Sequence, residues 1–195
     1  MKHIAFSLLQ PALLLLAGCN ANSEYSSEPC RFVYDNSIHL NAALASAMVP
    51  ESRGVFCKIT ESSWGGVKYL NFQTNNGQQT DPERETEPEK QADFILGVNN
   101  GIIVGFQTMN QQPYGGFVAY DVQCPNCMRR ENNHLNPKFA VSMSQNGIAT
   151  CSKCSKKYDM NNGGIVQNGE EGDTGLLKYV ASTTGPYGVV SVHSR

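Results

Sequence analysis

Short runs of apolar and β-branched residues recur along the chain between clusters of glycine, asparagine and proline. This spacing is typical of antiparallel strands joined by turns. The expected strands are 31–34, 55–60, 67–72, 94–98, 102–107, 117–122, 178–183 and 189–193. Such a series predicts an all-β fold, an antiparallel sandwich or barrel.

Two segments add local detail to this pattern. The Asn100-Gly101 pair lies between apolar runs and favours the positive φ angles of a tight turn, so 94–106 is expected to form a hairpin. Alanine and leucine cluster over 40–48 ahead of Pro50, which predicts one short helix.

Two further segments have both a structural and a functional interpretation. The run 81–90 is charged and contains prolines, so a solvated loop is expected, with an acidic recognition loop as the alternative. Trp64 stands before two glycines. It is expected to be a packed or half-buried turn aromatic rather than a platform for a ligand.

The N-terminal residues have a different character. After a short basic start, the apolar run 4–16 is too short to span a bilayer, which needs about 20 apolar residues, and it is typical of a secretory signal. The run ends in Leu-Ala-Gly-Cys19, which resembles the lipobox of bacterial lipoproteins. The resemblance implies that 1–18 is removed, that Cys19 carries lipid, and that 19–29 is a lipidated tether. An ordinary signal with an incidental cysteine is the alternative.

The residue after the lipobox cysteine bears on the destination of the protein. Asn20 stands where lipoproteins retained at the inner membrane carry aspartate, so the resemblance implies an outer-membrane anchor, with the domain facing the periplasm or the cell exterior. The remaining residues, 30–195, are expected to form one domain. The net charge of −2 and the lack of a basic stripe argue against a nucleic-acid partner. The membrane is the expected partner, and an envelope protein is a second one.

The chain has seven cysteines, and lipid on Cys19 would leave six for the domain. Cys30 and Cys57 lie at or beside expected strands without a chelating neighbour, and in an exported protein a disulfide between them is expected.

The other four cysteines form two CxxC pairs, Cys124-Pro-Asn-Cys127 and Cys151-Ser-Lys-Cys154. Each pair can place two sulfurs on one ion, and two pairs complete the tetrahedron of a structural zinc site. The gap between the pairs is longer than the usual 15–20 residues or so of a zinc ribbon. A thioredoxin-like dithiol is not expected, because the residues after Cys127 do not have a helical pattern.

The surroundings of the CxxC pairs resemble the Rieske iron–sulfur domains. The stretch 117–126 resembles their first cluster-binding box, in which a strand leads into Cys-Pro-His. The stretch 151–163 resembles their second box, Cys-x-x-His followed by an aromatic residue, aspartate and glycine, and 176–192 resembles the closing strands. The resemblance implies a Rieske-like β domain over 30–195, with two zinc-ribbon-like metal-binding loops at about 120–165.

The ligands depart from the Rieske pattern. A Rieske cluster needs two cysteines and two histidines. Here Asn126 stands at the first histidine position and is followed by Cys127, and Cys154 replaces the second histidine. His134 falls at neither position and is expected to be a surface or loop residue. The resemblance therefore implies the fold without the Rieske cluster.

Three occupants of the four-cysteine site stay open: zinc, disulfides without metal, and iron. The leader lacks the arginine pair of a twin-arginine signal, so the chain should cross the membrane unfolded and without a cluster. Zinc is the first expectation, and a [2Fe-2S] cluster or another iron centre is the alternative. Because a closed four-cysteine site leaves no position for substrate, we expect a non-enzymatic binding or structural role in the cell envelope, with an electron carrier as the alternative.

Overall fold

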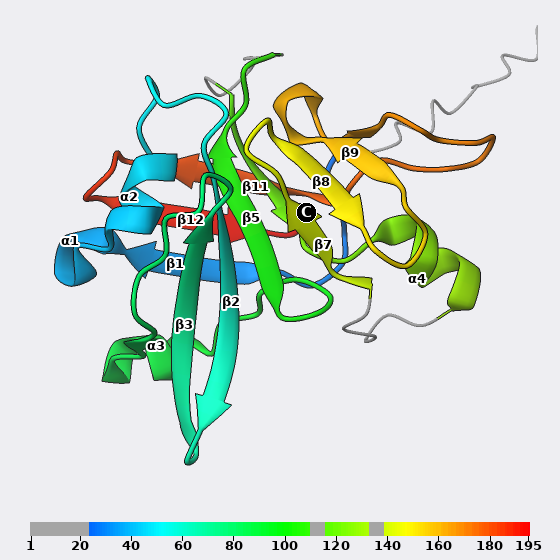
Figure 1. Ribbon diagram of the computed structural model, residues 1–195. Coiled ribbons are helices and arrows are strands. Elements are labelled where there is room, and N and C mark those ends of the chain that lie inside the picture. The colour runs from blue at the N-terminus through cyan, green and yellow to red at the C-terminus, as the bar shows by residue number, and fades with distance from the viewer. Residues whose placement is uncertain (1–23, 110–115, 133–138) are drawn as a thin grey trace, which may run out of the picture.

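Antiparallel strands dominate the computed structural model, which describes residues 24–109, 116–132 and 139–195 (Figure 1). Within these ranges, eight strands form a large sheet in the order β1-β12-β11-β6-β5-β2-β3-β4, and four form a small sheet in the order β10-β9-β8-β7. The large sheet comprises β1 (Arg31–Asp35), β2 (Phe56–Trp64), β3 (Val67–Thr74), β4 (Glu83–Arg84), β5 (Gly101–Phe106), β6 (Phe117–Asp121), β11 (Lys178–Thr183) and β12 (Val189–His193). The small sheet comprises β7 (Val141–Met143), β8 (Ile148–Cys151), β9 (Lys157–Asp159) and β10 (Ile165–Val166). The expected all-β antiparallel class is confirmed.

Some of the sequence predictions fall outside the described ranges. These are the expected leader, the expected lipidation at Cys19, the first part of the expected tether, and His134. Among the described residues, no helix is both long enough and apolar enough to cross a membrane.

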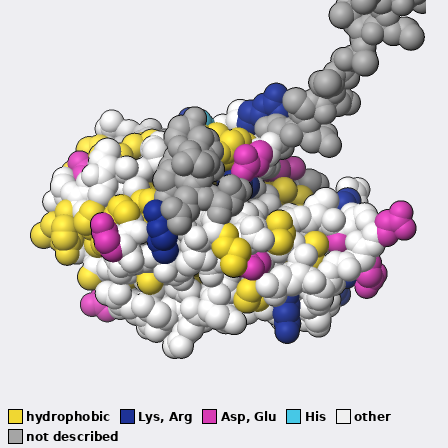
Figure 2. Space-filling model, turned by 90° about the horizontal axis from the view of Figure 1, so that it is seen from above, with side chains coloured by type: hydrophobic (Ala, Val, Ile, Leu, Met, Phe, Trp, Pro, Cys, Tyr) yellow, Lys and Arg dark blue, Asp and Glu magenta, His cyan; other side chains and the backbone are white. Residues whose placement is uncertain are grey.

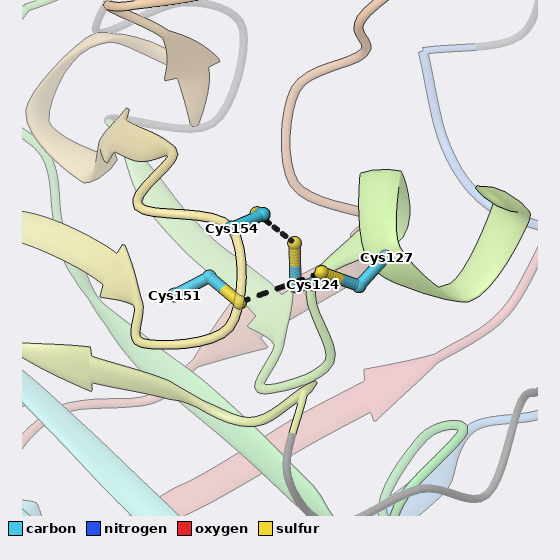
Figure 3. Close-up of side chains that lie close together, drawn as sticks. All are labelled: Cys124, Cys127, Cys151 and Cys154. Atoms are coloured by element: carbon cyan, nitrogen blue, oxygen red, sulfur yellow. Dashed lines mark hydrogen bonds between the residues drawn. The ribbon is translucent and has the colours of Figure 1, made fainter. Parts of the chain in front are cut away.

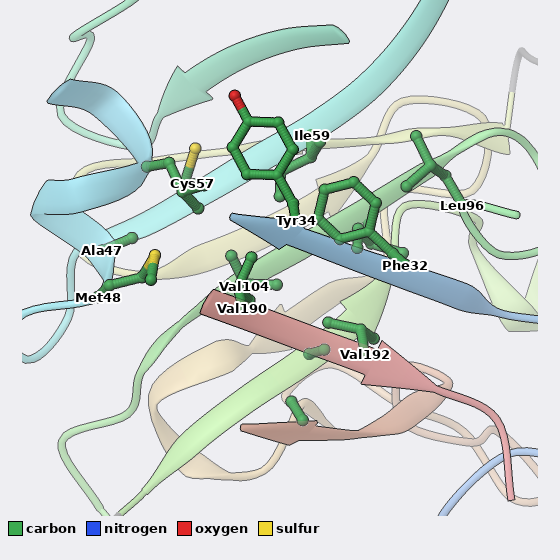
Figure 4. Packing of buried hydrophobic residues seen from close by; sticks show 14 of the residues in the cluster. Phe32, Tyr34, Ala47, Met48, Cys57, Ile59, Leu96, Val104, Val190 and Val192 are labelled. Atoms are coloured by element: carbon green, nitrogen blue, oxygen red, sulfur yellow. The ribbon is translucent and has the colours of Figure 1, made fainter. Parts of the chain in front are cut away.

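The large sheet curls so that its two ends face one another. Strand β1 lies at one edge, yet Tyr34 on β1 packs against Phe72 on β3 near the opposite edge, with ring centroids 5.4 Å apart. Alternate residues of β1 and β12 are buried, as expected for strands with one face toward a core. The enclosed core holds mainly aliphatic and aromatic side chains (Figure 4). The result is the barrel-like closure that the strand pattern predicts.

Short helices lie beside the barrel. They are α1 (Asn36–His39), α2 (Ala42–Ala47), α3 (Glu87–Ala92), α4 (Pro125–Glu131) and the 3₁₀ turn η2 (Met160–Asn162). Helix α2 begins at Asn41, whose side chain accepts a hydrogen bond from Leu44 N at 2.8 Å. Its apolar face packs against β2, β3 and β5. The helix expected within 40–48 is therefore confirmed.

Strands β5 and β6 are buried on both faces. One face belongs to the barrel core, and the other packs against the small sheet. This second core includes Ile103, Val118 and Tyr120 from the large sheet and Ala149 and Tyr158 from the small one. The two sheets therefore meet across β5 and β6.

The predicted hairpin over 94–106 is wrong. Strand β5 pairs with β2 and β6 instead, and 94–98 forms an isolated bridge to β1 followed by a turn. The buried carboxylate of Asp121 determines this local structure, because it accepts a hydrogen bond from Val98 N at 2.7 Å. At Gly97, with φ of +71°, an added Cβ would lie 2.2 Å from Asp121 Oδ2. The apolar run 94–98 therefore leads into a turn that packs over the Asp121 carboxylate instead of forming a strand.

The predicted loop over 81–90 is wrong in its secondary structure, because the run contains β4 and the first part of α3, although its residues are solvent-accessible apart from Glu85. Thr86 and Glu89 form a capping box at the start of α3, in which Thr86 N donates to Glu89 Oε2 at 2.7 Å. Glu85 is buried. The charges of this run are thus partly used within the fold.

Trp64 does not have the half-buried position that the sequence suggests. It ends β2 at the tip of the β2–β3 hairpin and is 80% exposed. Gly65 and Gly66 form the turn with φ of +58° and +78°, angles that glycine adopts readily. The hairpin projects from the body of the domain (Figure 1).

Candidate metal centre

The structure brings the four cysteines of the two CxxC pairs together (Figure 3). Cys124 is the N-cap of α4, and Cys127 lies in the first turn of that helix. Cys151 ends β8, and Cys154 lies in the turn that leads to β9. The four sulfur atoms lie within 4.8 Å of one another. This cluster could hold a metal ion.

The spacing of the sulfurs fits a tetrahedral ion. Cys124 Sγ and Cys154 Sγ are 3.6 Å apart, and Cys127 Sγ and Cys151 Sγ are 3.7 Å apart. Four sulfurs at the usual Zn–S distance of about 2.3 Å would stand about 3.8 Å from one another at the corners of a tetrahedron. Thiolate sulfur is a soft ligand that suits zinc and iron.

The centre is largely closed to solvent. Cys124, Cys127 and Cys151 are buried, whereas Cys154 is partly exposed. On the side of Cys127 and Cys154, a hollow of about 350 Å³ is also lined by Arg130, Glu131 and Lys153. A tetrahedral ion held by four sulfurs would have no open position for a substrate.

A buried hydrogen-bond chain supports Cys124. Tyr158 Oη lies 3.0 Å from Cys124 Sγ and accepts a hydrogen bond from Asn126 Nδ2 at 3.0 Å. Because the amide donates to this oxygen, the hydroxyl proton of Tyr158 is directed toward the sulfur. Asn126 also bonds both backbone groups of Thr174, each at 2.9 Å. The residue at the expected first histidine position therefore joins two loops instead of facing an ion.

The pKa values of the thiols reflect burial and mutual contact. Burial raises the pKa of the Cys124 thiol to about 11, although the hydrogen bond from Tyr158 opposes the shift. Burial also raises the pKa of Cys127. Burial acts the same way on Cys154, but hydrogen bonds from Lys156 N–H and from the other thiols outweigh it and lower that pKa. Four thiolates this close repel one another, so full deprotonation requires a cation at their centre.

Basic side chains surround the thiols. Arg130 donates from Nε to Asn126 O at 3.2 Å, and its pKa is raised by Cys127 and Cys154 against the effect of desolvation. Lys156 is buried and pairs with Asp173 at 2.7 Å and with Glu170 at 3.2 Å. The Lys156 contacts hold the 168–174 segment to the loop that follows Cys154, and Arg130 places positive charge near Cys127 and Cys154.

Sequence reasoning missed several features of this centre. The expectation that no helix follows Cys124 is wrong, because α4 begins there with Pro125 at its first position, a favoured place for proline. Within the described residues, however, β6 and β7 lie in different sheets and all pairings are antiparallel. The βαβ surroundings of a thioredoxin-like dithiol are therefore lacking in this part of the chain.

The predicted disulfide between Cys30 and Cys57 is wrong, since both are free and buried. Cys30 precedes β1, whereas Cys57 lies beside Tyr34 near the other end of that strand (Figure 4). Four strand residues cover about 13 Å, and a disulfide requires Cα atoms within about 7 Å. Burial raises the pKa of each thiol to about 12, which leaves both protonated and unreactive.

Comparison of the chain with protein-family models, with curated proteins and with solved structures found no match. The four-cysteine cluster and its hydrogen-bonded surroundings are therefore the features from which a function is argued.

Proposed function

We propose that this protein is a lipid-anchored component of the cell envelope whose Rieske-like β domain holds a structural zinc ion on Cys124, Cys127, Cys151 and Cys154. The observation that carries the proposal is the sulfur spacing of 3.6 and 3.7 Å in a largely buried cluster. It agrees with the edge of a zinc tetrahedron. The role is structural or binding, not catalytic.

Compactness favours one ion over a two-iron cluster. A [2Fe-2S] cluster contains two irons and bridging sulfides, and each iron takes its own pair of protein ligands. The two ligand pairs must then stand apart, whereas all four sulfurs here lie within 4.8 Å of one another. A single iron would fit the same tetrahedron, so an electron carrier with one iron is the second candidate.

The position of the cysteines supports a structural role. Cys124 and Cys127 follow β6 of the large sheet, whereas Cys151 and Cys154 belong to the small sheet. An ion shared by them would cross-link the two sheets at the edge of their common core. Metal-binding free energy would then contribute directly to folding.

The location of the first described residues is compatible with a lipid anchor at Cys19. Glu24 contacts Lys178 at the start of β11, and Ser26 N donates to Lys178 O at 2.7 Å. Glu24 lies five positions after Cys19, a distance along the chain of at most about 18 Å. A lipid on Cys19 would therefore hold this side of the domain close to the membrane.

Metal analysis and visible absorption of protein purified from its native compartment test the proposal. We expect a colourless protein with about one zinc per chain. The Cys151→Ser variant should lose the zinc, whereas Cys30→Ala, which removes a thiol outside the cluster, should retain it. A reddish-brown chromophore that bleaches on reduction would establish the iron alternative. Absence of metal together with absence of free thiols in the cluster would reject both.

A further inference from the structure

The tip of the β2–β3 hairpin presents an aromatic surface that the metal centre does not use. In the register of these strands, Ser62 pairs with Tyr69 and Trp64 pairs with Val67. Cross-strand partners share a face and adjacent residues alternate, so these four side chains lie on one face of the hairpin. Figure 1 shows the tip pointing away from the small sheet and α4.

This face forms a hollow. Ser62, Trp64 and Tyr69 line it together with Pro82, which lies in the connection between β3 and β4. Its volume of about 380 Å³ lies within the range of small-ligand sites. Trp64 is 80% exposed, so a large apolar ring stands open to solvent beside the hollow.

The chemistry of the lining points to a neutral ligand. The four residues that line the hollow are uncharged, and Lys68 lies on the opposite face of the hairpin. Arg84 on β4 pairs with Tyr69 and lies on the same face, next to the hollow but outside its lining. The Ser62 hydroxyl accepts a hydrogen bond from Asn71 Nδ2 at 2.9 Å. Its own proton is therefore directed away from Asn71, toward a further acceptor. Two aromatic rings next to hydroxyl groups suit a molecule that is apolar on one side and rich in hydroxyls at its edge.

We infer that this hollow binds a neutral saccharide. A pyranose ring places the C–H bonds of its flatter side on the electron-rich face of an aromatic ring, and its hydroxyls exchange hydrogen bonds with polar side chains. Trp64 and Tyr69 provide the rings, and Ser62 provides a polar contact.

The hairpin holds the site in shape before a ligand arrives. Strands β2 and β3 pair without interruption from Cys57–Thr74 to Trp64–Val67. Asn100 Nδ2 also donates to Glu61 O at 3.2 Å and braces the outer part of β2. A rigid site loses little conformational entropy on binding.

Fluorescence gives a direct test, because Trp64 is the single tryptophan of the chain. The full-length protein is titrated with maltohexaose, cellohexaose and chitohexaose, and emission and acrylamide quenching are recorded. We expect a saturable blue shift and protection from quenching with at least one of them. Calorimetry on variants then locates the site: Trp64→Ala and Tyr69→Ala should weaken binding at least about tenfold, a loss of about 1.4 kcal/mol each. Tyr187→Ala, which removes another exposed aromatic ring, should bind normally.

Several results would overturn the inference. One is the absence of saturable binding of all three oligosaccharides at concentrations up to about 10 mM, which would mean that any dissociation constant is weaker than the millimolar range. Another is unchanged affinity in a folded Trp64→Ala variant, which would place the sugar elsewhere. A blue shift with vesicles of phosphatidylethanolamine and phosphatidylglycerol, without one for sugars, would identify the tip as a membrane contact. None of these results depends on the metal in the four-cysteine centre.

Discussion

Tyr158→Phe tests whether the four cysteines act as metal-bound thiolates. The substitution removes one hydroxyl and keeps a ring that is fully buried in the core between the sheets. The hydroxyl lies 3.0 Å from Cys124 Sγ. A hydrogen bond to a charged group contributes about 1.5–3 kcal/mol, and groups that support metal ligands typically change metal affinity by about 10–100-fold. We therefore expect Tyr158→Phe to weaken zinc binding by one to two orders of magnitude.

A competition titration against a chromophoric chelator measures this change. Tyr179→Phe is a matched control, because Tyr179 is also fully buried and its hydroxyl donates to Asp121 Oδ2 at 2.7 Å, away from the sulfurs. That variant should melt at a lower temperature, since it leaves a buried carboxylate with one donor fewer. Its zinc affinity should stay at the wild-type value.

The comparison between the two tyrosines decides the outcome. Wild-type zinc affinity in Tyr158→Phe would refute the idea that the hydroxyl stabilises a metal-bound thiolate. Equal losses of affinity in both variants would mean that zinc binding responds to general destabilisation of the domain.

Three further expectations concern other parts of the molecule. Cys151→Ser should greatly lower the melting temperature. Structural zinc contributes an apparent free energy of about 10 kcal/mol to folding, which is comparable with the whole stability of a domain. An unchanged melting temperature would contradict a structural role. Cys19→Ser should leave the circular dichroism spectrum intact and move the protein from the membrane fraction to the soluble one, and continued sedimentation with membranes would contradict the lipid anchor. The hydrogen bond from Lys156 lowers the pKa of Asp173 below its usual 3.8. The stability that this pair contributes is therefore fully present above about pH 3.8, and it is lost as the pH falls through the lower pKa of the folded state. Asp173→Asn should therefore be less stable than wild type at neutral pH, with the difference vanishing in acid; a pH-independent difference in urea unfolding would contradict this assignment.

Local pattern predicted the strands of the large sheet except β4, but not their ends or partners, and it predicted none of the short strands of the small sheet. The apolar part of β2 was visible in the sequence, whereas its polar outer half, Glu61 to Ser63, pairs with β3 only because the register continues to the glycine turn. The opposite error occurred at 94–98, where an apolar run forms no strand. The Asp121 carboxylate, distant in sequence, accepts the backbone N–H of Val98. Neither effect is encoded in the local alternation of residues.

The candidate site was predictable as far as covalent spacing constrains it. Two residues between cysteines predict that each pair can share an ion, and the structure places the two pairs together. The support of the site depends on contacts across long sequence separations, such as Asn126 with Tyr158 and with Thr174. The Cys30–Cys57 disulfide was inferred from an even number of cysteines, and this count carries no information about distance.

The small sheet gives a physical reason for the centre to be structural. Its strands are only two to four residues long, too short to be stable as an isolated sheet. The small sheet is stabilised by packing against β5 and β6, in a core that buries Phe139, Ala149 and Tyr158. In the same core, Cys151 and Cys154 lie close to Cys124 and Cys127, and an ion there would add four bonds between the small sheet and the segment that follows β6. Asn126, which is hydrogen-bonded to Tyr158 and Thr174, contributes to the same connection between the two loops.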